Sequence, residues 1–180
     1  MFRRMKLVVS ALVILLILGI GGELFHGMLA SVIWHWRNGD SIAVAGIEVS
    51  VPKPWFVDQA NNMVVELGRP HLPTLRGIPF ESRITVSVSP KAVTDLQFWE
   101  SQENALYAGT LMGRREIRTT AQDRIVCFEG KLVQQALKIT NSNLITVNCQ
   151  SNGRLNLSFT GTEKDLPEFY TIVERIRFGT

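Results

Sequence analysis

The sequence predicts an α+β protein in which an N-terminal transmembrane helix is followed by one domain, a mainly antiparallel sheet flanked by helices. Three observations support this fold class. An apolar run opens the chain, alternating apolar and polar residues recur after it, and apolar residues three and four apart recur near its end. Short strands without regularly interleaved helices favour an antiparallel sheet. We therefore divide the chain into a membrane segment, 1–37, and a domain, 38–180.

The first part of the chain is predicted to attach it to a membrane. A basic tip with Arg3, Arg4 and Lys6 precedes the apolar stretch Leu7–Phe25, whose single charged residue is Glu23. Nineteen helical residues at about 1.5 Å each span roughly 28 Å, close to the ~30 Å core of a bilayer. The basic tip places the N-terminus in the cytoplasm. We therefore expect a bacterial inner-membrane protein whose domain is periplasmic or otherwise extracytoplasmic.

Cleavage of this segment as a signal peptide is the alternative. The nearest candidate site, Met28-Leu29-Ala30, has a large residue where a signal peptidase requires a small one. We therefore expect the segment to be retained, and release near Ala30 would change the location without changing the domain.

The apolar run continues into an amphipathic helical stretch that ends near Asn38-Gly39-Asp40. Its apolar stripe contains Leu24, Phe25, Met28, Leu29, Val32, Ile33 and Trp36. Its opposite side contains His26, Gly27, Ser31, His35 and Arg37. Such a stretch could lie in the outer headgroup layer, with Trp34 and Trp36 as interface anchors, or it could pack on a partner helix. The spacing leaves both interpretations open.

The charge distribution argues against a nucleic-acid partner. Residues 1–37 contain four Lys or Arg and one acidic residue, whereas residues 38–180 contain fifteen of each sign. A neutral domain lacks the basic surface that dominates affinity for nucleic acids. A local basic cluster is interpreted as a solvated strand face rather than an anion site, because acidic residues dilute it. It comprises Arg114, Arg115, Arg118 and Arg124, with Glu116 and Asp123 among them.

Alternation at strand spacing identifies four strands of the domain. Their inward-facing sets are Ile47, Val49 and Val51; Ile84, Val86 and Val88; Ile145, Val147 and Cys149; and Leu155, Leu157 and Phe159. The turn signal Ser151-Asn152-Gly153 separates the last two sets and predicts a hairpin.

Two helices are expected to cover the sheet. The first extends from Thr94 to Gly109, and its Thr94 and Gln97 have the spacing of a capping box. The second begins near Asp165-Leu166-Pro167. Its buried face is predicted to contain Phe169, Ile172, Val173 and Ile176. The Pro-rich stretch Arg69–Phe80 is predicted to be an exposed loop.

Cys127 and Cys149, the two cysteines of the chain, lie in strand-like runs and have the parity of neighbouring core residues. Adjacent strands would allow them to pair. In an oxidising extracytoplasmic compartment we expect a disulfide, which stabilises the fold by roughly 3 kcal/mol in the chain-entropy model. Two buried free thiols are the alternative. With no C-x-x-C motif and no neighbouring histidine, a metal site is not expected.

No catalytic set is recognisable in the sequence. Two of the three histidines, His26 and His35, precede the domain, and His71 lies in the Pro-rich loop without a nucleophile motif. Glu100 and Glu103 are three apart and are interpreted as a solvated helix face. No glycine-rich phosphate loop occurs. We therefore expect neither enzymatic activity nor a cofactor.

Three segments together resemble the PsbP-like superfamily: the extended run Ile47–Trp55 with its Pro-x-x-Trp end, the strand Leu155–Gly161 and the closing helix Phe169–Phe178. That family includes extrinsic photosystem II proteins, a Ran-release factor and DcrB-type exported proteins, and the resemblance covers roughly residues 42–178. It implies a sandwich-like antiparallel sheet flanked by helices, used for binding and assembly and occasionally for chaperoning hydrophobic segments. It implies no catalytic set, and this chain lacks the lipobox cysteine of the lipoprotein members.

The sequence therefore predicts a single-pass membrane protein whose exported domain binds a protein partner, as an accessory or assembly factor of an envelope complex. Candidate contacts are Trp34, Trp36, Trp55 and His71, since aromatic residues dominate interface energetics. For Trp55, a core position capping the sheet is the competing interpretation. The alternative function is small-ligand binding between the sheet and the 94–109 helix, with His71 or the 114–118 run at the mouth of the pocket.

Overall fold

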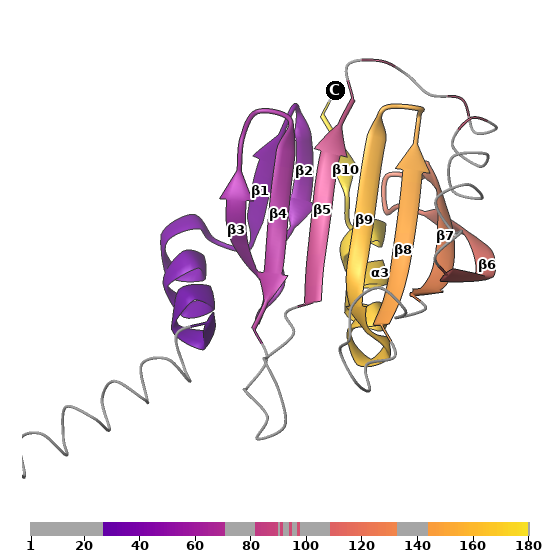
Figure 1. The fold of residues 1–180 in the computed structure, drawn as a ribbon. Coiled ribbons are helices and arrows are strands. Elements are labelled where there is room, and N and C mark those ends of the chain that lie inside the picture. Colours follow the sequence, from indigo (N-terminus) through magenta and orange to yellow (C-terminus); the bar gives the residue numbers. More distant parts are fainter. Residues whose placement is uncertain are drawn as a thin grey trace, which may run out of the picture.

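The computed structural model describes residues 27–70, 82–89, 91, 94, 97, 109–132 and 144–179. Its main element is a seven-stranded antiparallel sheet in the order β3-β4-β5-β9-β8-β7-β6, shown face-on in Figure 1. The strands are β3 (Phe56–Ala60), β4 (Val64–Arg69), β5 (Ser82–Val88), β6 (Gly109–Arg118), β7 (Arg124–Leu132), β8 (Leu144–Ser151) and β9 (Leu155–Thr162).

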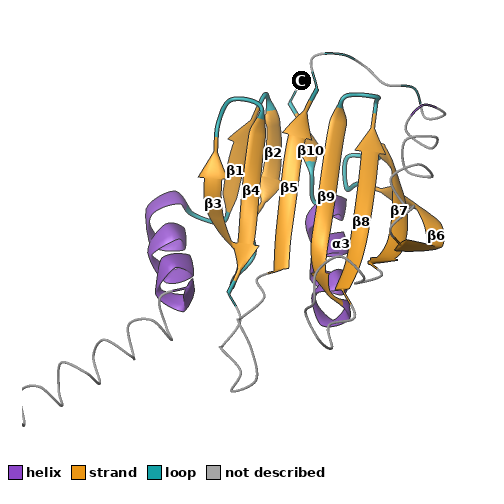
Figure 2. Ribbon diagram, in the orientation of Figure 1, coloured by secondary structure: helices purple, strands orange, loops and turns teal. Residues whose placement is uncertain are grey.

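A second layer covers one face of this sheet. It consists of a small antiparallel sheet, β1-β2-β10, and the helix α3, which lies behind β8 and β9 in Figure 2. The bounds are β1 (Ser41–Val44), β2 (Ile47–Ser50), α3 (Leu166–Glu174) and β10 (Arg177–Phe178), and the 3-10 turn η2 (Glu163–Asp165) leads into α3. The core lies between these two layers.

Strict alternation along the strands explains where the core forms. In β9 the buried and half-buried positions alternate without a break, so Leu157 and Phe159 face the second layer. Opposite them, α3 buries Phe169, Ile172 and Val173. The rings of Phe159 and Phe169 stack with their centroids 5.1 Å apart. Burying one such side chain stabilises a fold by about 1.5–3 kcal/mol, so this contact holds α3 on the sheet.

The structure confirms the predicted strands and the hairpin between the last two. All four predicted inward-facing sets belong to the core cluster or pack against it. β8 pairs with β9 in antiparallel register, and the loop between them contains Asn152 and Gly153 with φ of 51° and 66°. Asparagine and glycine are the residues that adopt positive φ at least cost.

The predicted disulfide is also confirmed. Cys127 in β7 and Cys149 in β8 are register partners in adjacent antiparallel strands and are bonded to each other. Both are fully buried in the core cluster.

The capping box at Thr94 is present. The Thr94 N–H donates to Gln97 Oε1 and the Gln97 N–H donates to Thr94 Oγ1, both at 3.2 Å. Most of the helix predicted from there to Gly109 lies outside the described residues, and Gly109 itself begins β6.

The predicted fold class is wrong in its balance of helix and sheet and in its transmembrane helix. In the part of the chain that the structure describes, strands dominate, and the α-helical residues are 27–38, Gln97 and those of α3. Within that part no helix is long and apolar enough to cross a bilayer. Twelve residues span about 18 Å, well short of a ~30 Å hydrocarbon core. The run Leu7–Phe25, for which the transmembrane helix was predicted, and residues 71–80 of the predicted Pro-rich loop lie outside the described residues.

Candidate functional site

The helix over residues 27–38, which lies beside β3 in Figure 1, turns its polar side toward the domain. Ser31 and His35 on that side are only 3% and 7% exposed. Five large apolar side chains on the other side are between 47% and 82% exposed, and we call them the apolar helix face. They are Met28, Leu29, Val32, Ile33 and Trp36. A surface helix usually buries its apolar stripe, so this orientation is reversed.

Hydrogen bonds to one carbonyl group explain the reversed orientation. The backbone oxygen of Trp55 accepts from Ser31 Oγ at 3.4 Å and lies 2.9 Å from His35 Nε2. A buried carbonyl requires a hydrogen-bond partner, and the polar side of the helix provides two. The other ring nitrogen, His35 Nδ1, lies 2.9 Å from Asp40 Oδ1 and 3.0 Å from the Gly39 oxygen. His35 thereby links the helix, the turn that ends it and the domain.

Trp55 is buried, which corrects its assignment as a candidate partner contact. Its side chain is 0% exposed, and its indole N–H donates to Glu168 Oε2 at 2.8 Å. A ring enclosed in the core with its one polar atom already paired cannot contact a partner in this conformation. The competing interpretation, in which Trp55 caps the sheet from inside, describes its position.

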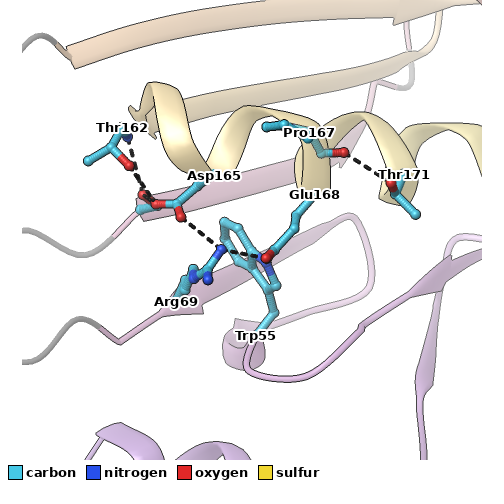
Figure 3. Close-up of polar contacts among 8 residues, drawn as sticks. Trp55, Arg69, Thr162, Asp165, Pro167, Glu168 and Thr171 are labelled. Atoms are coloured by element: carbon cyan, nitrogen blue, oxygen red, sulfur yellow. Dashed lines mark hydrogen bonds and ion pairs between the residues drawn. The ribbon is translucent and has the colours of Figure 1, made fainter.

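A cluster of charged and polar groups surrounds the start of α3, and Figure 3 shows how they converge. Its members, which we call the α3 cluster, are Trp55, Arg69, Ser82, Thr162, Asp165 and Glu168. Arg69 Nη1 lies 2.7 Å from Asp165 Oδ1 and 2.5 Å from Glu168 Oε2. Ser82 and Thr162 donate to Asp165 Oδ2 at 2.5 and 2.9 Å.

The chemistry of the α3 cluster is structural. Asp165 is fully buried, and both of its oxygens are engaged, one by the Arg69 guanidinium and one by two hydroxyls. A buried carboxylate is tolerated only when its charge is paired and hydrogen-bonded. The partial positive charge at the start of α3 adds to this compensation. The cluster therefore fixes α3 against β4 and β5.

The α3 cluster also supports the apolar helix face. Glu168 in α3 holds the ring of Trp55, and the carbonyl of the same Trp55 holds Ser31 and His35. A continuous series of hydrogen bonds therefore leads from the core helix to the helix that presents the exposed apolar side chains. Side chains on such a supported element keep a defined orientation.

The sequence reasoning did not identify the α3 cluster. It treated Arg69 as the start of a loop and Asp165 only as the beginning of a helix. The Arg69 and Glu168 contact joins residues 99 positions apart, and the Ser82 and Asp165 contact joins residues 83 apart. The one local signal was an acidic residue in the first turn of a predicted helix. Such a residue is favourable there whether or not it has a charged partner, so it does not indicate a pair.

The far side of α3 has a second polar contact. The Tyr170 hydroxyl donates to Glu129, and the Arg115 guanidinium lies 4.3 Å above the Tyr170 ring. Burial, assisted by the contact with Glu129, raises the pKa of Tyr170 above its ordinary value of about 10. Arg114 and Arg118 are exposed, as predicted for a solvated strand face, and Arg115 is exposed but packs over this ring.

A hollow of about 380 Å³ lies next to the small sheet, and none of its lining residues belongs to the predicted pocket. It is lined by Ser41, Glu48, Ser50, Thr120, Arg175 and Arg177. Its volume is within the range of small-ligand sites, about 300–1,000 Å³, but such sites are usually lined by apolar side chains. Among the residues described by the structure, no group of three or more His, Cys, Asp or Glu side chains could hold a metal ion.

The remaining predicted contact residues have different environments. Trp36 is the most exposed member of the apolar helix face. Trp34 is partly buried and packs against the core cluster. His71 lies outside the described residues.

Comparisons with known proteins identify a weak likeness to a solved structure. No family model matches the chain, and no curated protein matches it either. Among solved structures, it is similar to cyanobacterial PsbP (CyanoP) from Synechocystis sp. PCC 6803, with 13% sequence identity and a TM-score of 0.41. The similarity covers 74% of this chain and 86% of that one. The PsbP-like resemblance is thereby supported only as a weak likeness to this structure.

Proposed function

We propose that this chain is a membrane-attached accessory protein whose exported domain binds a protein partner in an envelope complex. The observation that carries the proposal is the apolar helix face, five large apolar side chains held toward solvent by a helix whose polar side is docked, because such a face is typical of a surface that a membrane or another protein covers. Leaving it in water costs free energy, so we expect it to be covered in the working protein.

The cysteines support the extracytoplasmic part of the proposal. Cys127 and Cys149 form a disulfide in the core, and structural disulfides persist mainly in oxidising compartments such as the periplasm. The basic tip of the chain and the apolar run after it support membrane attachment. The proposed location is therefore the bacterial inner membrane, with the domain on its periplasmic side.

The α3 cluster favours a binding role over a catalytic one. Its charged groups are paired with one another, and its most buried member, Asp165, accepts from two hydroxyls besides its contact with Arg69. Groups used in proton transfer need an accessible position facing a substrate. The cluster instead keeps the helix that carries the apolar helix face in place.

Site-specific photo-crosslinking of the full chain in cells tests the proposal. A photoreactive residue would replace Trp36 on the apolar helix face, Gln59 in β3, Arg118 in β6 or Arg177 in β10, all of which are exposed. We expect one protein to be crosslinked reproducibly from at least one position and to copurify from gently solubilised membranes. Samples kept in the dark are the control. A chain that yields no stoichiometric companion from any of the four positions would contradict the proposal.

The hollow beside the small sheet favours a second candidate function, the binding of a small anionic ligand. Arg175 and Arg177 line the hollow together with Ser41, Ser50 and Thr120, and with Glu48, whose carboxylate lies 3.9 Å from Arg177 and offsets part of its charge. A ligand that binds only the folded state raises the melting temperature by mass action. A thermal-shift screen of carboxylates and phosphate esters, with an Arg175→Ala and Arg177→Ala double variant as control, separates the two functions. A shift that the double variant abolishes would favour the ligand-binding function.

A further inference from the structure

Resting on the proposed function, we infer that the apolar helix face lies on a lipid bilayer, at the boundary between headgroups and acyl chains, and that the protein partner binds elsewhere on the domain. Three features of the chain lead to this occupant: the composition of the face, its continuity with the preceding sequence, and the way the helix is docked.

The composition of the apolar helix face suits a lipid interface. Its five exposed side chains are all large and apolar, and the most exposed is Trp36, at 82%. Tryptophan is enriched at the level of the headgroups, because its ring is apolar and its N–H is polar. A short amphipathic helix lying flat on a membrane buries its apolar face about 5–10 Å into that boundary. Exposed Arg37, next to Trp36, can meet anionic headgroups there, offset in part by exposed Asp40.

The sequence that enters this helix argues for lipid rather than a protein groove. The apolar run Leu7–Gly22 lies directly upstream, and Leu24 and Phe25 continue the same stripe as Met28 and Leu29 by their spacing. A run this apolar is itself excluded from water. A bilayer can accommodate the run and the helix face as one continuous surface, whereas a protein would need a groove shaped to both.

The docking of the helix keeps this face available. Turning the apolar side inward would remove the hydrogen bonds of Ser31 and His35 to the Trp55 carbonyl, leaving a buried acceptor unpaired. The domain therefore cannot cover the face without breaking its own polar contacts. Since the α3 cluster fixes Trp55 in turn, contact of the helix with a membrane sets the orientation of the whole domain above it.

Depth-dependent quenching in reconstituted vesicles tests the inference. The full chain carrying Val32→Cys is labelled with an environment-sensitive fluorophore and placed in vesicles of phosphatidylcholine and phosphatidylglycerol. Both native cysteines are in the disulfide, so only the introduced thiol reacts. The matched control is Ala121→Cys, an exposed position in the turn between β6 and β7. Ile33→Cys serves as a second reporter on the apolar helix face.

We expect nitroxide lipids labelled at a shallow acyl position to quench the label at Val32 and at Ile33 several-fold more than the label at Ala121. A solvent-like, unquenched label at both helix positions, in chain that still sediments with the vesicles, would overturn the inference. Quenching between labelled copies without nitroxide lipid would assign the face to a second copy and also overturn it.

The outcome can be separated from that of the proposed function. If the helix labels are quenched by lipid but photo-crosslinking finds no protein from any position, the inference stands and the protein-binding function fails. If Trp36 is crosslinked to a protein and the helix labels are not quenched by lipid, the function stands and the inference fails.

Discussion

Two helices of this molecule have similar amphipathic patterns and opposite orientations. α3 buries its apolar side chains, including Phe169 and Ile172, against the large sheet. The helix over residues 27–38 instead buries Ser31 and His35 and exposes its apolar side. The comparison teaches that an amphipathic spacing identifies a helix and its two faces, but the surface on which the helix docks decides which face is buried.

The surfaces beneath the two helices differ in polarity. α3 lies over β8 and β9, whose inward positions are apolar, so its apolar side is favoured there. The 27–38 helix lies against the segment that enters β3, where the Trp55 carbonyl accepts its hydrogen bonds. A polar acceptor at the contact favours the polar side of the helix.

Truncating one apolar side chain on each helix gives the largest expected contrast. Phe169→Ala should lower the free energy of unfolding by about 3–5 kcal/mol, because it leaves a cavity in the core. Val32→Ala should change it by less than about 0.5 kcal/mol, because Val32 faces solvent. Urea denaturation measures both values. Similar losses for the two variants would mean that the apolar helix face is packed inside the protein.

Removing the charge partner of Asp165 is expected to have the next largest effect. Arg69→Ala should cost about 3 kcal/mol, since it leaves a buried carboxylate without compensation. Arg83→Ala is the matched control, because Arg83 contacts Asp58 and Glu66 at an exposed position and should cost less than about 1 kcal/mol. Equal effects in chemical denaturation would show that the α3 cluster is not the anchor of α3.

Loosening the 27–38 helix should have a smaller and local effect. His35→Ala removes a ring that contacts both the Trp55 carbonyl and Asp40, at a cost of about 1–2 kcal/mol. Hydrogen exchange should show faster exchange of amides in 27–38 and no change in α3. Asn38→Ala, which removes an exposed side-chain bond to the Trp34 carbonyl, is the control. Faster exchange in both helices would indicate that the two are coupled through Trp55.

The smallest expected effect is on how steeply the free energy of unfolding falls at alkaline pH. The pKa of Tyr170 is raised mainly by burial, so the folded state keeps the phenol proton to a higher pH than the unfolded chain does. This contribution is fully present below about pH 10 and is lost as the pH rises above it. Tyr170→Phe should therefore show a shallower loss of unfolding free energy between about pH 9 and about pH 11. An unchanged slope would mean that Tyr170 ionises equally easily in both states.

Much of the sheet could be predicted from local spacing, whereas contacts between distant segments could not. Alternation located the strands around Ile84 and Leu157. The turn signal Asn152-Gly153 located the hairpin that joins β8 to the strand of Leu157. The hairpin between β1 and β2 was not identified, because its positive-φ residues are Ala45 and Gly46 and alanine is not a turn signal there.

Local spacing was enough to predict which residues alternate, where α3 begins, and that Cys127 and Cys149 have core parity. These properties depend on spacing along one segment, which local backbone geometry converts directly into faces. The burial of Trp55, the pairing of Arg69 with Asp165 and the docking of the 27–38 helix by its polar side could be seen only in the folded chain. Each of these depends on which groups distant segments bring together, because a buried polar group takes whichever partner the fold places within reach.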